Sequence, residues 1–357
     1  GPRLALLEIA WRSCRSLLRL ADRAAVHAGT RSRPQSVRRS LVATEMRDRW
    51  REGKRIAPPT GVDVDACLEE ARQAIQGRFR VLGFGFVDFG QPINWHADPL
   101  SGYEWPLEYH RGLRPATGRA DVKIVWEASR LHWAVALARA YRYSGDVRYL
   151  RAGIDLVGAW MRSNPMGFGP NWMTAMEVGI RLTNLCWAAE LFDSREFDAV
   201  VSQPVEAHAW HIMRNIEYAP SLTSNHFLGD ICGLAHAGAV LSRRGEIFGR
   251  FAHAALEREL RKQFYADGSN FESSTGYARL SAELCLLAAH ASEASGRPLS
   301  RAARDRLSAS VVALRTVQGQ SATMPAVGDD DSGLAVGLAS DRHPRDAYAL
   351  PNPDVPC

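Results

Sequence analysis

From about residue 120 onward, apolar residues recur every three or four positions, the spacing that places them on one face of an α-helix. Polar stretches and stretches rich in glycine and proline interrupt this pattern and divide it into segments. We therefore predict helices at residues 124–143, 147–162, 172–191, 197–214, 224–241, 246–264, 275–296 and 299–317.

The connections between these helices alternate between short and long. Those at 144–146, 192–196, 242–246 and 296–298 are short, whereas those at 163–171, 217–225 and 265–276 are longer and rich in turn-forming residues. Because successive antiparallel helices place alternate connections at opposite ends, we expect the long loops to lie together at one end. A single helix pair cannot bury its apolar face alone. We predict a mostly α fold, an incomplete α/α toroid of antiparallel helix pairs, with the functional residues at its long-loop rim.

The residues before this region follow a different pattern. Residues 61–120 contain strand-like apolar positions broken by glycines, as in RFRVLGFGFVDFG, followed by an aromatic-rich loop. We predict a basic N-terminal helix and linker at 1–60, a small irregular or β segment that caps the rim at 61–120, the toroid at 121–320 and a tail at 321–357.

The net charge of +5 is concentrated at the N-terminus. Residues 1–60 hold 14 lysines and arginines against 5 acidic residues. This basic segment is consistent with a solvated helix and its linker. Alternatively, it could contact nucleic acid, anionic lipid or an acidic polymer. No apolar run reaches the roughly 18 residues that cross a bilayer. The arginines scattered through the first 26 residues argue against an intact signal peptide.

Three polar residues stand at the start of predicted helices on the long-loop side. Asn225 and His226 open the fifth helix and Tyr277 opens the seventh, so the topology brings all three to one rim. Each also has a purely structural interpretation: Asn225 as a helix cap, His226 as a hydrogen-bonded histidine and Tyr277 as a packing residue with a solvated hydroxyl. Their convergence is what favours a functional interpretation.

The third and fifth helices carry further informative spacings. Glu177, Arg181 and Asn184 form one stripe on an otherwise apolar helix, either as a structural ion pair or as a substrate contact. On the fifth helix, small residues recur every four positions, at Gly229, Gly233 and Ala237, which favours close helix packing.

We expect neither a metal nor a cofactor. His208 and His211 lie three residues apart on a helix but have no third ligand nearby. The acidic stretch at 328–333 lacks the spacing of a calcium loop. The six cysteines are widely separated, and no phosphate loop or nucleophile elbow is present.

Several segments together resemble bacterial heparinase II/III-type polysaccharide lyases. They include NIEYAPSLTSNHFLGDICGLAHAG, FYADGSNFESSTGYARL and MPAVGDDDSG, and the resemblance extends over about residues 80–335. It implies an α/α toroid followed by a β-sandwich, and cleavage of uronic-acid-containing polysaccharides by β-elimination. It also implies that 321–357 holds only the start of that sandwich and a disordered tail, so that a truncated, inactive copy is one alternative.

The resemblance implies roles for the rim residues. Asn225 and His226 would neutralise the substrate carboxylate, and Tyr277 would transfer the proton. Arg279 and Arg181 would be the cations near this phenol, and Trp95 or Trp105 would offer further stacking surfaces. The expected substrate-binding residues are Lys123, Trp126, Glu127, Arg130, Trp172, Glu177 and Arg181.

Two other function classes remain open. One is a non-catalytic module that binds carbohydrate or assists exopolysaccharide assembly. The other is a hydrolase, which requires a carboxylate pair at the rim, with Asp267, Glu272 and Glu127 as candidates. We expect an acidic polysaccharide as partner and no nucleic acid. The resemblance favours a periplasmic or cell-envelope location.

Overall fold

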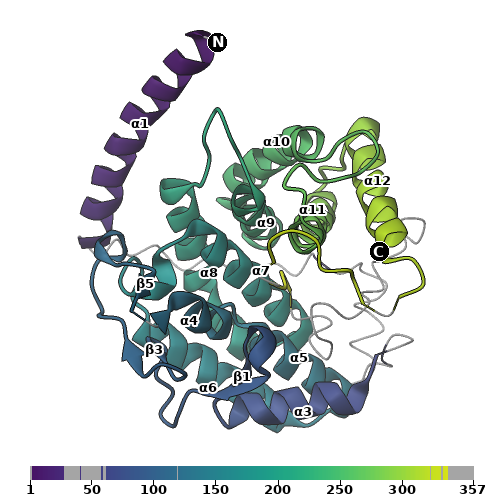
Figure 1. The fold of residues 1–357 in the computed structure, drawn as a ribbon. Helices are drawn as coiled ribbons and strands as arrows, with labels where there is room; N and C mark the ends of the chain where they lie inside the picture. Colours follow the sequence, from purple (N-terminus) through teal and green to yellow (C-terminus); the bar gives the residue numbers. More distant parts are fainter. Residues whose placement is uncertain are drawn as a thin grey trace.

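The protein is mostly helical in a computed structural model, which describes residues 2–27, 41, 58, 62–118, 120–321, 323–330 and 333–336 (Figure 1). Most of the predicted linker before residue 61 and the tail after residue 336 lie outside the described residues. None of the helices in the described ranges is long and apolar enough to cross a membrane.

The predicted helices are confirmed to within a few residues, with one exception. The segment predicted at 124–143 is two helices, because Leu131 between them adopts a left-handed conformation with φ 62°. Leu131 is fully buried, so the apolar pattern continues across the break and does not reveal it. The helices of this region are α4 (Val122–Ser129), α5 (His132–Ser144), α6 (Val147–Ser163), α7 (Ala175–Phe192), α8 (Arg195–Asn215), α9 (Asn225–Val240), α10 (Gly245–Gln263), α11 (Thr275–Ala294) and α12 (Arg301–Gln318).

The helices form an inner and an outer row. In the inner row, α5 packs on α7, α7 on α9 and α9 on α11, while α6, α8, α10 and α12 pack against them from outside. In α7 every residue except Trp187 is buried, and in α9 every residue except His226. The outer helices bury one face only, as amphipathic helices do. This double row is the predicted arc of a helical toroid.

Glycines allow the closest contact within the inner row. A Cβ atom added to Gly179 of α7 would lie 2.2 Å from the backbone oxygen of Gly229 in α9. One added to Gly233 would lie 2.7 Å from the Cα atom of Gly179. The small-residue spacing on α9 is therefore explained by close helix packing.

The segment before the toroid contains an element that the sequence analysis missed. Helix α3 (Val64–Ile75) packs on α5 and extends the inner row. Three antiparallel strand pairs follow, with short 3-10 turns η1 (Leu82–Phe84), η2 (His110–Gly112) and later η3 (Pro170–Trp172). The pairs are β1 (Arg78–Arg80) with β2 (Phe86–Asp88), β3 (Ala97–Asp98) with β4 (Tyr103–Glu104), and β5 (Ala116–Thr117) with β6 (Ala120–Asp121).

The predicted N-terminal helix is α1 (Pro2–His27), whose first turns project away from the body in Figure 1. Its second half is anchored by the buried carboxylate of Asp22. Asp22 Oδ2 accepts a hydrogen bond from the Tyr109 hydroxyl at 3.0 Å and lies 3.5 Å from His110 Nε2. This contact joins α1 to η2 at the rim.

The chain after α12 returns to the middle of the arc. The backbone N–H of Thr275 donates to Val327 O at 3.0 Å, which places this segment over the start of α11. Leu334, Ala335 and Val336 are then buried inside the inner row. Asn184 of α7 donates to Ala335 O at 3.0 Å, so the third member of the predicted polar stripe binds this returning segment.

Candidate functional site

Three inner helices begin at the same end of the arc. Their N-caps are Thr174 for α7, Ser224 for α9 and Ser274 for α11, and each side chain accepts a hydrogen bond from its helix's first turn. Helix N-termini carry partial positive charge, so this rim favours acidic groups. Carboxylates from the long loops occupy it in the present structure.

Asn225 is the first residue of α9, and its side chain is held by a carboxylate from another loop. Its Nδ2 atom donates to Glu272 Oε2 at 2.9 Å and to Oε1 at 3.1 Å. Its backbone N–H also donates to Glu272 Oε1, at 2.9 Å. Glu272 lies in the loop before α11, so a single carboxylate connects the start of α9 to the loop that leads to Tyr277.

His226 is exposed, unlike the rest of α9. Its side chain is 45% exposed, and its Nδ1 atom lies 3.2 Å from Glu217 Oε2. Burial lowers the pKa of this imidazole. The hydrogen bond and charge of Glu217, with the charges of Glu177 and Glu272, raise the pKa by more than burial lowers it. The pKa of His226 therefore lies above the ordinary value. The imidazolium is therefore favoured at the rim.

Tyr277 lies in the first turn of α11, where its backbone N–H donates to the Ser274 hydroxyl at 3.1 Å. Its phenol oxygen donates to Asp329 Oδ2, 3.3 Å away in the returning segment. The two arginines expected near this phenol bind other groups. Arg279 donates instead to Gly333 O at 2.6 Å and pairs with Glu283 at 3.3 Å.

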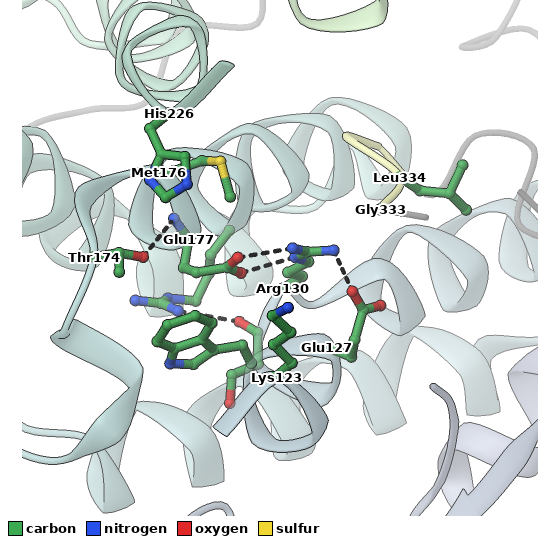
Figure 2. A network of polar contacts seen from close by, with 12 residues as sticks. Lys123, Glu127, Arg130, Thr174, Met176, Glu177, His226, Gly333 and Leu334 are labelled. Atoms are coloured by element: carbon green, nitrogen blue, oxygen red, sulfur yellow. Dashed lines mark hydrogen bonds and ion pairs between the residues drawn. The ribbon is translucent and has the colours of Figure 1, made fainter. Parts of the chain in front are cut away.

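A buried charge network lies below His226 (Figure 2). Arg130, which follows α4, binds the Glu177 carboxylate through two hydrogen bonds of 2.7 Å and also pairs with Glu127. Burial raises the pKa of Glu177, but the charge and hydrogen bonds of Arg130 lower it more, so this carboxylate stays ionised. Lys123 lies two turns before Arg130, in the same view as the pair. Glu177 thus pairs with Arg130 rather than within its own helix.

Two expected substrate-binding residues are core residues instead. Arg181 is fully buried, with its guanidinium 4.5 Å from the ring of Trp160 and 5.2 Å from that of Trp172. It donates to His208 Nε2 at 2.9 Å and to two backbone carbonyls. Burial lowers its pKa to about 9. The predicted roles of Arg181 as a substrate or phenol contact and of Trp172 as a stacking surface are therefore wrong.

The other tryptophans differ in exposure. Trp95 and Trp105 are 3% and 1% exposed and cannot present a ring to a sugar. Trp126 is half-buried, so part of its surface is accessible, and its Nε1 atom donates to Pro170 O at 2.9 Å. Trp126 therefore remains a candidate for stacking.

A pocket borders the charge network between α3, the β1–β2 hairpin and α5. Glu127 and His132 form one wall, and Arg78 and Arg80 lie in its lining together with aromatic rings. Arg80 packs over the ring of Phe86 at 4.5 Å. The carboxylates of Glu70 and Glu127 also line this pocket, and Arg78 is paired with Asp88 at 3.3 Å, so its charges are largely balanced.

No sequence pattern predicts a role for Glu217 or Asp329, and Glu272 is expected only as a hydrolase carboxylate. All three lie in loops, where no periodicity predicts the direction of a side chain. Within the described parts of the chain, no group of three or more histidine, cysteine or acidic side chains could hold a metal ion.

Comparisons with known proteins agree with this architecture. The family model described as Heparinase II/III N-terminus matches residues 43–303, well over half of the chain. A heparin-sulfate lyase of Pedobacter heparinus is 26% identical over 220 residues, covering 58% of this chain and 30% of that protein. A heparin-sulfate lyase of Bacteroides thetaiotaomicron is 26% identical over 185 residues, covering 46% of this chain and 26% of that protein.

Solved structures share the fold. A crystal structure of the heparan sulfate lyase HepC from Pedobacter heparinus has a TM-score of 0.54 at 21% identity and covers 76% of this chain and 42% of its own. A crystal structure of heparinase III has a TM-score of 0.53 at 18% identity, covering 75% and 42%. The chain thus spans less than half the length of these relatives. With the family model matched across its helical region, the chain belongs to the heparinase II/III family, in the part described as the N-terminus.

Proposed function

We propose that this chain is the helical part of a polysaccharide lyase that cleaves a uronic-acid-containing polysaccharide by β-elimination. The observation that carries the proposal is the placement of Asn225 and His226 at the start of α9, joined through Glu272 to the loop that leads into Tyr277. The heparin-sulfate lyases that match the chain support the same class of reaction.

The proposed chemistry begins at the substrate carboxylate. The hydrogen on the carbon next to it becomes acidic enough to remove when the carboxylate charge is neutralised. The His226 imidazolium and the Asn225 amide are the proposed donors to that group, because donors placed where negative charge develops stabilise the transition state. The positive ends of α7, α9 and α11 add to this effect.

Tyr277 is the proposed proton-transfer residue. When the proton is removed, the electron pair of the broken C–H bond forms a new carbon–carbon double bond. The C–O bond on the next carbon breaks, and the leaving glycosidic oxygen keeps that electron pair and takes up a proton. The Tyr277 phenol is oriented by Asp329 at 3.3 Å. Lys123 and Trp126, which are only partly buried, are the proposed contacts to neighbouring sugar units, whereas Arg130 is buried and bound by Glu127 and Glu177.

The hydrolase alternative receives less support. Asp267 is bound within its own loop by Ser269, Glu272 is bound by Asn225, and Glu127 is paired with Arg130. A glycoside hydrolase requires two carboxylates facing one glycosidic bond, one of them free to donate a proton. These three carboxylates have different partners on different elements.

The experiment follows the unsaturated product by its absorbance near 232 nm, with heparan sulfate, alginate and a bacterial exopolysaccharide as substrates. We expect an absorbance increase with the unmodified chain, extended if necessary by any C-terminal domain of the full protein. Tyr277→Phe should reduce turnover at least about 100-fold, the scale of a lost general acid–base group, and should leave sugar binding in place.

The matched control is Tyr265→Phe, because Tyr265 is 57% exposed in the loop before α11. It should retain full activity. Full activity of Tyr277→Phe would refute the assigned role. Sugar binding with no 232 nm product from any of the three polymers would favour the carbohydrate-binding alternative.

A further inference from the structure

The imidazole of His226 has one ring nitrogen engaged and one available. Nδ1 lies 3.2 Å from Glu217 Oε2, while Nε2 has no hydrogen bond to any residue that the structure describes. The side chain is nearly half exposed, in contrast to the buried residues on either side of it. The ring is therefore held at one edge and open at the other.

Glu217 is itself held in place from two sides. Its Oε2 atom also accepts the backbone N–H of Met176, at 3.0 Å, in the first turn of α7. Its own backbone N–H donates to Asp230 Oδ2 at 2.6 Å, and Asp230 lies one turn beyond His226 on α9. The carboxylate thus connects the starts of α7 and α9, and its backbone is tied to the helix that carries its partner.

The charged groups that face His226 come from several elements. Glu217 lies before α9, Glu177 lies on α7, and Glu272 lies before α11. The cations near Glu177 are Arg130, which is paired with Glu127 and Glu177, and the buried Arg181. Figure 2 also shows the side chain of a further cation, Lys123 of α4, together with this network. Among the residues that the structure describes, only Glu217 is in hydrogen-bond contact with the ring.

We propose that Glu217 is a positioning residue, which accepts the Nδ1–H of His226, keeps the ring as imidazolium and presents Nε2–H as a charged donor to an acid group of the substrate. The substrate part rests on the proposed function above. Glu217 does not touch the substrate in this arrangement. Its effect is to orient the ring and to keep it charged, since a hydrogen bond and a nearby negative charge both favour the protonated form.

A histidine titration followed by NMR tests the pairing without any substrate. In the unmodified protein, the neutral form of His226 should carry its proton on Nδ1, which the two ring 15N shifts report directly. A proton on Nε2 in the neutral form would overturn the proposal. This measurement needs no substitution, so it holds even if a variant fails to fold.

Two variants extend the test. Glu217→Gln removes the charge but leaves an oxygen for Met176 N–H, and it should move the His226 titration to lower pH; Glu217→Asp should restore part of that shift. The control is Glu293→Gln, at an exposed position at the far end of α11, which should leave the titration unchanged. An unchanged His226 titration in Glu217→Gln would overturn the proposal.

Activity distinguishes this proposal from the proposed function. If the unmodified protein produces 232 nm product, Glu217→Gln should lower kcat/KM roughly tenfold, the scale of one charge-assisted hydrogen bond, with most of the loss above the lowered titration midpoint. A loss that is equal at all pH values would overturn the charge argument. A protein with the expected titration but no product would refute the lyase and leave the Glu217–His226 pairing intact.

Discussion

The close approach of α7 and α9 at Gly179 can be tested by adding a single methyl group. Gly179→Ala adds a Cβ atom 2.2 Å from the backbone oxygen of Gly229 and 2.8 Å from its carbonyl carbon. Neither atom can rotate away, because both belong to the buried backbone of α9, so α7 and α9 must separate. Overpacking of this kind costs typically 1–3 kcal/mol and occasionally more, whereas alanine in place of glycine inside a helix gains about 0.8–1.0 kcal/mol. Because the obstacle is backbone, we expect a net loss of about 2 kcal/mol.

The assay is urea unfolding followed by tryptophan fluorescence, which gives the free energy of unfolding in water. The slope of this free energy against urea concentration should be the same in all variants, so that a change in midpoint reports a change in stability. The control is Gly158→Ala on the outer helix α6, where the nearest atom is Arg162 Nη1 at 3.2 Å, at the end of a flexible side chain. This variant should gain about 0.5–1 kcal/mol from helix propensity alone. If Gly179→Ala were as stable as the unmodified protein while the control gained stability, the close-packing argument would be refuted.

Two further predictions concern carboxylates that bind across elements. Glu272→Gln weakens the hydrogen bonds that hold Asn225 and should lower kcat roughly tenfold, with little change in melting temperature. The control Asp267→Asn, in the same loop, should leave kcat unchanged. A normal kcat in Glu272→Gln would contradict the role of Glu272 in holding Asn225. Burial raises the pKa of Asp22, but hydrogen bonds from His110 and Tyr109 and the charge of His211 lower it to about 2, below the unfolded value of about 3.9. Ionised Asp22 therefore contributes stability above pH 4, on the order of 2 kcal/mol, and this is lost as the pH falls from 4 toward 2. Asp22→Asn should be less stable than the unmodified protein in urea at pH 7, with a difference that shrinks below pH 4; a difference independent of pH would contradict this mechanism.

The sequence by itself determined the helices and their order. Apolar spacing located every helix from α6 to α12 to within a few residues, because a helix that buries one face must repeat that face every 3.6 residues. Loop length indicated which helix starts lie together, because antiparallel neighbours alternate their ends. The pattern did not show the break at Leu131, since a buried leucine fits the apolar face whether the helix continues or stops.

Only the tertiary structure decided which polar residues are at the rim and which are in the core. Glu177 and Arg181 share one stripe of α7, yet Glu177 meets Arg130 beneath His226, and Arg181 is enclosed between two tryptophan rings. Glu217 and Glu272, which hold His226 and Asn225, have no periodic signal because they lie in loops. Local spacing reports which side of its own helix a residue occupies. Its partners are set by the neighbouring helices and loops, and the cost of burying an unpaired charge then fixes each pairing.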